Sequence, residues 1–168
     1  AVALTGREGA ALESYKKTVL ELNNQVIAQA PKDLIINTHV CRGNYHSTYF
    51  SSGAYDGVAD LLFGEENVNA YYLEYDDERS GGFAPLAKMT GEKKVVLGLV
   101  TTKTPELEDK AKIIARIHEA EKYIPLNRLY LSPQCGFASC EIGNKLTEEE
   151  QWAKLKLVKE IAEEVWGK

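Results

Sequence analysis

Four short apolar runs, each followed by a segment able to form a helix, constrain this chain more than any other feature. The runs cover residues 34–36, 68–73, 95–100 and 129–131. Short apolar runs that alternate with helical segments are typical of βα units, which build a parallel sheet with helices packed outside it. The chain is therefore predicted to be α/β, with about four βα units and parallel strands.

The expected helices lie before, between and after these runs. Residues 7–30 have helical periodicity and end at Pro31, and shorter helical segments are expected at 53–63 and 85–89. A hydroxyl cap, a proline and an acid at positions 104–106 predict a helix that runs to about residue 123. Its inward side chains are expected to be Leu107, Ile113, Ile114 and Ile117.

Thr147 and Glu150 have the spacing of a capping box, which predicts the start of a last helix. Five apolar residues share one face of that helix: Trp152, Leu155, Val158, Ile161 and Val165. No linker, repeat or low-complexity tract interrupts the chain, so residues 1–168 are expected to form a single unit. Four βα units make half of an eight-stranded (β/α)8 TIM-type barrel, which indicates a piece of a longer protein.

Composition excludes several classes of function. The net charge is −5 with the acids scattered, which disfavours nucleic-acid or anionic-membrane partners. No stretch approaches the ~18 consecutive apolar residues of a membrane span, and no signal peptide is visible at the amino end. Three cysteines, an odd number, indicate a reducing compartment and hence a cytoplasmic location.

Four side chains at or just past the ends of the predicted strands form a candidate metal site. They are His39, Cys41, Glu74 and Cys135, which together offer one imidazole, two thiolates and one carboxylate. Zinc accepts nitrogen, sulfur and oxygen ligands in tetrahedral geometry. Because these residues extend from position 39 to position 135, only a folded core could gather them, which favours a catalytic metal over a short structural knuckle.

Each residue also has a plainer interpretation. His39 and Cys41 could be a buried imidazole beside an inert cysteine, since free cysteine is often part of a core. Glu74 could be a solvated loop acid, and Cys135 a packed thiol. Cys140 competes with Cys135 for the same metal, but it is the weaker candidate because its segment has the pattern of an exposed loop.

Other polar residues near the predicted strand ends are candidates for substrate contacts. Arg42, Glu74, Asp76 and Ser80 could hold the ammonium and carboxylate groups of an amino-acid substrate, or they could belong to salt bridges that brace the loops. His46 lies just past the first two ligands and could face the substrate, whereas His118 falls on a helix and is expected at the surface.

Three motifs now support a family resemblance. The segments "THVCRGN" and "SPQCGF", together with a glutamate followed by "RSG", resemble cobalamin-independent methionine synthase, and especially its short relatives built from the catalytic barrel alone. The resemblance extends from about Ile35 onward and implies strands five to eight, the carboxy-terminal half of the barrel. It also implies zinc held by His39, Cys41, Glu74 and Cys135.

The resemblance implies methyl transfer to a thiol in methionine biosynthesis. Zinc would bind the thiol of homocysteine and lower its pKa, and the thiolate would attack the methyl group of a donor. The family carries a histidine at the end of strand seven, but alignment on Pro105 places Val100 there, with His46 as a speculative substitute. A corrinoid or other non-folate donor therefore stays open, as does a non-catalytic zinc-binding fragment.

A half-barrel has two unpaired sheet edges, which proteins normally avoid. The chain is therefore expected to form a homo-oligomer or to associate with a missing amino-terminal half.

Overall fold

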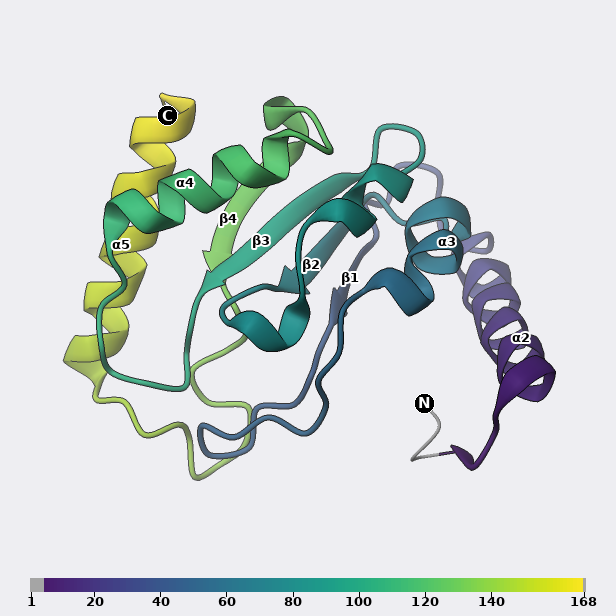
Figure 1. Ribbon diagram of the computed structural model, residues 1–168, viewed down its shortest axis with the longest axis horizontal. Helices are drawn as coiled ribbons and strands as arrows, with labels where there is room; N and C mark the ends of the chain where they lie inside the picture. Colours follow the sequence, from purple (N-terminus) through teal and green to yellow (C-terminus); the bar gives the residue numbers. More distant parts are fainter. Residues whose placement is uncertain (1–4, 168) are drawn as a thin grey trace.

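The computed structural model describes residues 5–167, in which four strands form one parallel sheet (Figure 1). Their spatial order follows the chain: β1 (Asn37–Val40), β2 (Ala70–Glu74), β3 (Lys94–Val100) and β4 (Leu129–Pro133). Because all four strands run in one direction, their carboxyl ends meet at the same edge of the sheet. The α/β class and the parallel order predicted from the sequence are confirmed.

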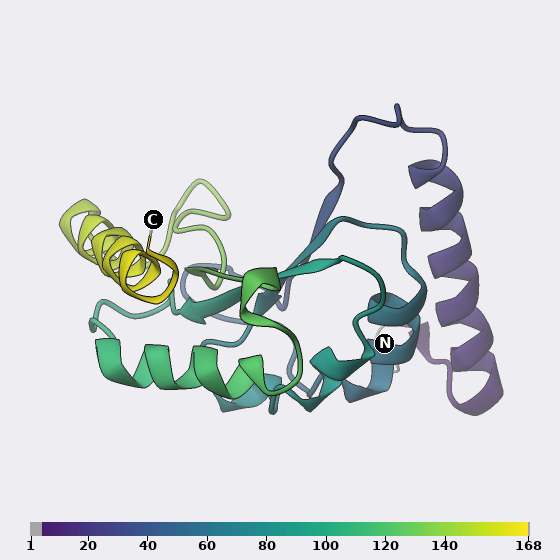
Figure 2. The same cartoon turned by 90° about the horizontal axis from the view of Figure 1, so that it is seen from above.

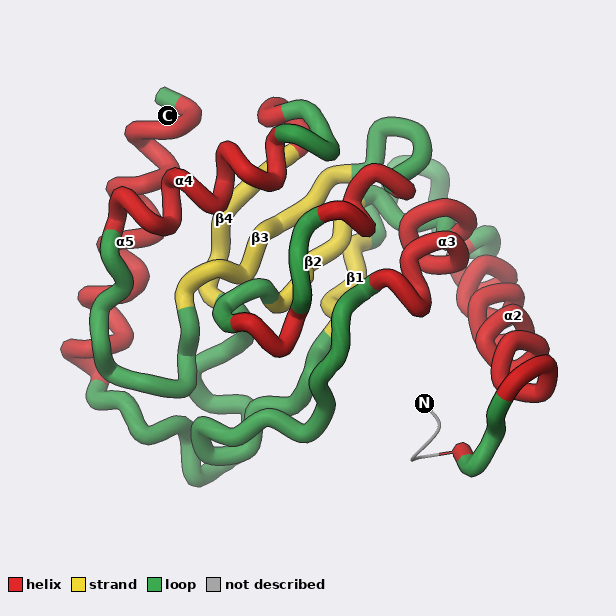
Figure 3. The backbone as a smooth tube through the Cα atoms, viewed as in Figure 1, coloured by secondary structure: helices red, strands yellow, loops and turns green. Residues whose placement is uncertain are grey.

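Helices alternate with these strands, as Figure 3 shows by colour. The long helices are α2 (Gly9–Ile27), α3 (Asp56–Glu65), α4 (Lys110–Glu121) and α5 (Glu148–Trp166). Short 3₁₀ helices occupy η1 (Glu78–Ser80), η2 (Ala84–Lys88) and η3 (Leu126–Arg128). In the view of Figure 2, α4 is drawn below the sheet and α2 to the right of it. Within the described residues, no helix is long and apolar enough to cross a membrane.

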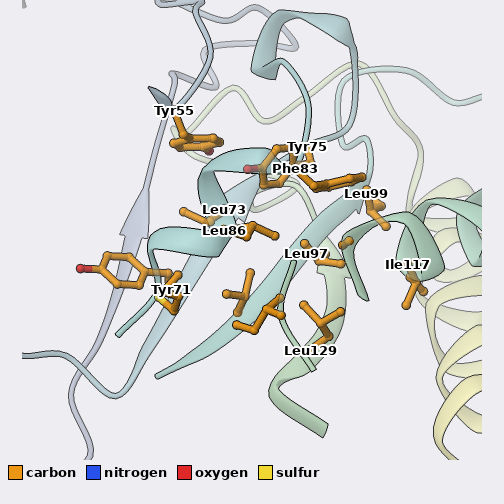
Figure 4. Close-up of a cluster of buried hydrophobic side chains, with 14 of the residues drawn as sticks. Tyr55, Tyr71, Leu73, Tyr75, Phe83, Leu86, Leu97, Leu99, Ile117 and Leu129 are labelled. Atoms are coloured by element: carbon orange, nitrogen blue, oxygen red, sulfur yellow. The ribbon is translucent and has the colours of Figure 1, made fainter. Parts of the chain in front are cut away.

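The core lies around the two central strands, β2 and β3 (Figure 4). Six of the seven residues of β3 are buried, which explains why its apolar run is continuous rather than alternating. Aromatic rings from the loops and from α3 continue this core toward the carboxyl edge of the sheet. Tyr75 contacts Tyr55 and Phe83 with ring centroids 5.1 and 4.7 Å apart. The packed core thus holds the end of β2, where Glu74 lies, rigidly in place.

The first predicted strand is displaced along the chain. The apolar run 34–36 precedes β1, and Leu34 and Ile35 are 55% and 72% exposed. Pairing with β2 begins only at Asn37, which lies opposite Ala70. Just before it, the backbone N–H of Ile36 donates to the side chain of Asn69 rather than to a backbone carbonyl. An apolar run without a neighbouring strand does not make a strand.

The predicted helix start at Thr104 is wrong, since α4 begins at Lys110 with Asp109 as its cap. The reason is a tertiary contact: the ammonium of Lys154, on α5, donates to the carbonyl of Glu106 at 2.6 Å and to the carboxylate of Glu108. These bonds hold residues 106–108 as a loop. Leu107, predicted to point inward, is 54% exposed, whereas Ile113 and Ile117 are buried as expected.

The capping box of α5 is confirmed, since Thr147 and Glu150 exchange hydrogen bonds between side chain and backbone. Its buried face differs from the expected apolar face. Ile161 is buried as expected, but Trp152 is 60% exposed, and Lys154 and Leu157 are buried although they were not predicted on that face.

Candidate metal centre

His39 is oriented by its neighbours on the sheet. It lies on β1 opposite Tyr72 of β2, and its Nδ1 is 3.2 Å from the Tyr72 carbonyl oxygen. Nδ1 donates its proton to that carbonyl, so Nε2 is the nitrogen directed at Glu74, 3.4 Å from Oε1. A histidine whose second nitrogen donates to a backbone carbonyl is the usual arrangement of a metal-ligating imidazole.

Glu74 ends β2 and is fully buried. Its Oε1 accepts the backbone N–H of Arg42 at 3.0 Å, and its Oε2 lies 3.3 Å from the guanidinium of Arg79. Burial acts to raise the pKa of this carboxyl, but hydrogen bonds from His39 and from the Arg42 N–H outweigh it and lower the pKa to about 2. The carboxylate is therefore held both ionised and in one orientation.

The two thiols flank the imidazole. A hydrogen bond to His39 lowers the pKa of Cys135 to about 7, and the same pairing, followed by the bond to Glu74, raises the pKa of His39 to about 10. Cys41 follows β1 and receives a hydrogen bond from the Gly43 N–H at 3.4 Å. The site thus stabilises a thiolate before any metal binds.

The four ligand atoms of His39, Cys41, Glu74 and Cys135 all lie within 4.8 Å of one another. Tetrahedral zinc, with bonds of about 2.0 to 2.3 Å, places its ligand atoms about 3.3 to 3.8 Å apart, so small side-chain movements would close the set around an ion. Two sulfurs, one nitrogen and one oxygen also suit zinc chemically. Cys140 does not belong to this group. The residues present fit a zinc ion.

The proposed substrate contacts lie at the same edge but are engaged with one another. The Arg42 guanidinium stacks over the Tyr55 ring at 4.3 Å and donates to the Gly53 carbonyl. Asp76 pairs with Arg79 at 2.8 Å. These contacts match the loop-bracing alternative, and a substrate role for Arg42, Asp76 or the buried Ser80 stays a prediction.

The two other histidines lie apart from the ligands. His118 is exposed on α4 and pairs with Glu121 at 3.0 Å, as expected for a surface residue. His46 lies in the loop after β1, where its Nδ1 is 3.0 Å from the Gly143 carbonyl oxygen. A catalytic role for His46 stays a prediction.

Sequence reasoning missed Lys103 and Gln134. Lys103 follows the end of β3, is only 9% exposed, and its ammonium has no hydrogen-bond partner among the described residues. Burial lowers its pKa, while the charges of Asp76 and Glu74 act to raise it. Gln134, beside Cys135, accepts from Thr102 through Oε1 but leaves its buried Nε2 unpartnered. A lysine three residues after the end of a continuous apolar strand was the available signal.

Comparison with known proteins decides the family. A family model described as the catalytic domain of cobalamin-independent synthase matches residues 7–164. The chain belongs to this family. The likeness read from the sequence motifs is thereby confirmed, and Val100, where the family histidine was expected, is a fully buried residue of β3.

Two relatives show how much the sequence identity and the coverage vary among similar proteins. The uncharacterized protein YxjG of Bacillus subtilis is 53% identical over 144 residues, which are 85% of this chain and 38% of that protein. A methionine synthase of Pyrococcus abyssi is 28% identical over 101 residues, covering 60% of this chain and 26% of that one.

A crystal structure from Listeria monocytogenes, provisionally assigned as a vitamin-B12-independent methionine synthase, has a TM-score of 0.73 and 39% identity. The match covers 96% of this chain and 44% of that one. The chain therefore spans about two fifths of the length of YxjG and of this structure. The parallel α/β unit described above is thus a part of the TIM-barrel catalytic domain that such proteins contain.

Proposed function

We propose that this chain takes part in zinc-dependent methyl transfer to a thiol, with homocysteine as the acceptor. The observation that carries the proposal is the gathering of the His39, Cys41, Glu74 and Cys135 ligand atoms within 4.8 Å at the carboxyl edge of the sheet. Membership in the cobalamin-independent synthase family supports the reaction class.

Zinc bound here would act as a Lewis acid that lowers the pKa of an incoming thiol, so that a thiolate is present at neutral pH. The chain's own residues prepare the ligands. The Tyr72 carbonyl orients the imidazole of His39, and the Arg42 N–H and Arg79 hold the carboxylate of Glu74. A ligand set that is oriented in this way needs only small side-chain movements to bind a metal.

The surrounding charges suit an amino-acid substrate. We propose that Glu74, Asp76, Arg42 and Ser80 contribute to its binding, with His46 as a proton-transfer group. Lys103 is an additional candidate, because a buried cation without a hydrogen-bond partner stabilises negative charge that develops during transfer. It lies on the loop after β3, near the strand end at which the family histidine was expected.

The methyl donor is open. The aliphatic side chain of Val100 is fully buried and offers no proton, which favours a donor other than a folate, such as a corrinoid.

An alternative to both donors is that the chain is a zinc-binding unit that needs the rest of the barrel for activity, in agreement with its partial coverage of its relatives. Its partner would be the missing half or a second copy, and a cytoplasmic location remains part of the proposal.

Zinc content is the primary test. After exhaustive dialysis without added metal, the chain should carry about one zinc ion, and Cys135→Ser should lose it. Cys140→Ser is the matched control and should keep zinc. If Cys140→Ser loses the metal and Cys135→Ser retains it, the ligand assignment is wrong.

Methyl transfer then separates the donors. Homocysteine is supplied with methyltetrahydrofolate or with methylcobalamin, and methionine is measured with the chain alone and with a full-length relative. Product from the chain alone would exclude a non-catalytic fragment.

A further inference from the structure

The two cysteine ligands follow opposite edges of the sheet. Cys41 follows β1 and Cys135 follows β4, and these are the two outer strands of the order β1-β2-β3-β4. In a flat sheet three strand spacings separate such strands by about 14 Å. Their sulfur atoms nevertheless lie within 4.8 Å of each other. The segments that follow the two outer strands therefore approach each other at this edge, in a chain that supplies only four strands of a barrel.

Hydrogen bonds between the two outer loops connect these segments. The amide nitrogen of Asn44, three residues after Cys41, donates to the Gly136 carbonyl at 2.6 Å and to the Ser139 hydroxyl at 2.8 Å. The amide nitrogen of Asn144 donates back to Asn44 Oδ1 at 3.0 Å. Gly136 adjoins Cys135, so Asn44 ties the segment of one cysteine ligand directly to that of the other.

The loop after β1 contains a strained turn. Tyr45 and Thr48 exchange backbone hydrogen bonds of 3.0 and 2.9 Å around the two residues between them. Both central residues have positive φ, 43° at His46 and 67° at Ser47. Such turns favour Asn-Gly, because residues with a Cβ pay a cost of about 1 kcal/mol or more in this conformation.

The strained residues are used to bind the other loop. His46 Nδ1 lies 3.0 Å from the Gly143 carbonyl oxygen, and the Ser47 N–H donates to Asn144 Oδ1 at 3.2 Å. The Ser47 hydroxyl accepts the N–H of Lys145 at 2.8 Å. Strain held in place by contacts to a distant segment marks a functional constraint on the backbone. In Figure 1 the two loops run beside one another below the sheet.

We propose that residues 44–48 and 143–145, which we call the loop clasp, hold the outer strands together so that this chain assembles its metal ligands without the other barrel strands. Asn144 is the central positioning residue, because it also donates to the Thr102 carbonyl at 2.7 Å and so connects the clasp to the loop after β3. The inference rests on the proposed zinc site, but proximity of the two thiols tests it without metal.

The variant that tests the clasp is Asn144→Ala, made in the 168-residue chain. The matched control is Asn24→Ala, since Asn24 also bridges two segments, donating to the Glu65 carbonyl at 3.0 Å and accepting the Asn67 N–H at 2.8 Å far from the ligands. Zinc affinity is measured by competition with a chromophoric chelator. We expect a 10- to 100-fold loss for Asn144→Ala, of the order seen for residues that orient metal ligands, and none for Asn24→Ala.

A second readout separates positioning from loss of stability. Cobalt(II) replaces zinc, and its ligand-field absorption reports tetrahedral geometry at the metal. Asn144→Ala should change this spectrum while its midpoint of urea unfolding shifts no more than that of Asn24→Ala. An unchanged spectrum with wild-type zinc affinity would overturn the proposal. If Asn144→Ala does not fold, Asn44→Ala is measured in the same way with the same expectations.

The third readout is independent of metal. In a Cys140→Ser background, dibromobimane bridges Cys41 and Cys135 of the metal-free chain, and the rate of bridging reports their proximity. We expect at least a tenfold slower reaction in Asn144→Ala. An equal rate would refute the clasp even if zinc binds. Fast bridging in the parent chain that slows in the variant supports the clasp, and if that parent chain also bound no zinc, the proposed function alone would fail.

Discussion

Two buried lysines in this chain differ in the hydrogen bonds that their ammonium groups make. Lys154 on α5 is completely buried, and its ammonium donates to the Glu106 carbonyl and to both carboxylate oxygens of Glu108. Lys103, after β3, is nearly as buried, yet its ammonium has no hydrogen-bond partner among the described residues. The ammonium of Lys154 is thus fully hydrogen-bonded, whereas that of Lys103 has only charged neighbours.

The difference indicates that Lys154 has a structural role and Lys103 a functional one. A buried charge costs free energy unless it is paired, so Lys154 persists because it holds a loop against a helix. Lys103 makes no such bond; burial lowers its pKa, and the nearby charges of Asp76 and Glu74 act to raise it. Unpartnered charge beside a candidate ligand set is typical of a functional site. The same substitution at both positions tests this interpretation.

The largest effect on stability is expected for Lys154→Met. It removes the ammonium from the Glu106 carbonyl and from the Glu108 carboxylate, which keeps only the N–H of Thr101. The free energy of unfolding should fall by about 3 kcal/mol, the low end of the range for broken buried pairs. The low end applies because the Glu108 side chain is 18% exposed. Urea denaturation measures the change, and zinc content should be unaltered. Lys156→Ala, in a surface pair, serves as control and should change stability by under about 0.5 kcal/mol.

An intermediate effect is expected for Gly98→Ala, on β3 opposite Glu74. An added Cβ would lie 2.8 Å from both the Gln134 Cα and the Leu73 carbonyl oxygen, so the backbone beside two ligands must move. Unfolding free energy should fall by about 2 kcal/mol, and zinc affinity should fall with it.

Gly64→Ala in α3, where no atom lies within 4 Å of the new Cβ, is the control for Gly98→Ala. It should raise stability by about 0.5 to 1 kcal/mol without changing zinc affinity. Equal zinc affinity in both glycine variants would show that the ligand edge does not depend on this close backbone approach.

The smallest effect on stability is expected for Lys103→Met, because no hydrogen bond is lost. Its free energy of unfolding should change by less than about 1 kcal/mol. Methyl transfer should nevertheless fall about 100-fold, the usual scale when a charge-stabilising group is removed. The measurement pairs urea denaturation with turnover in whichever assembly is active. A loss of stability as large as that of Lys154→Met, with turnover intact, would remove the distinction between the two lysines.

Much of the fold could be predicted from local pattern. The order of strands and helices follows from apolar runs and caps, as at Thr147 and Glu150, because these signals act between residues close in the chain. The errors have a common cause. The helix expected at Thr104 is displaced by Lys154, which lies 50 residues away in sequence, and the strand expected at 34–36 pairs with β2 only from Asn37 onward.

The candidate site, too, was in part predictable from the sequence and in part visible only in the tertiary structure. The sequence by itself determined the chemical kinds of ligand and their places at strand ends, and the motifs around His39, Cys41, Glu74 and Cys135 sufficed to indicate the family. Only the tertiary structure showed that the candidate ligand atoms lie within 4.8 Å of one another, that the Lys103 ammonium lies buried without a hydrogen-bond partner among the described residues, and that Asn44 and Asn144 connect the outer loops. The last of these facts depends on the distance between segments about 100 residues apart, which is set by the packing of the strands and their loops rather than by any local pattern.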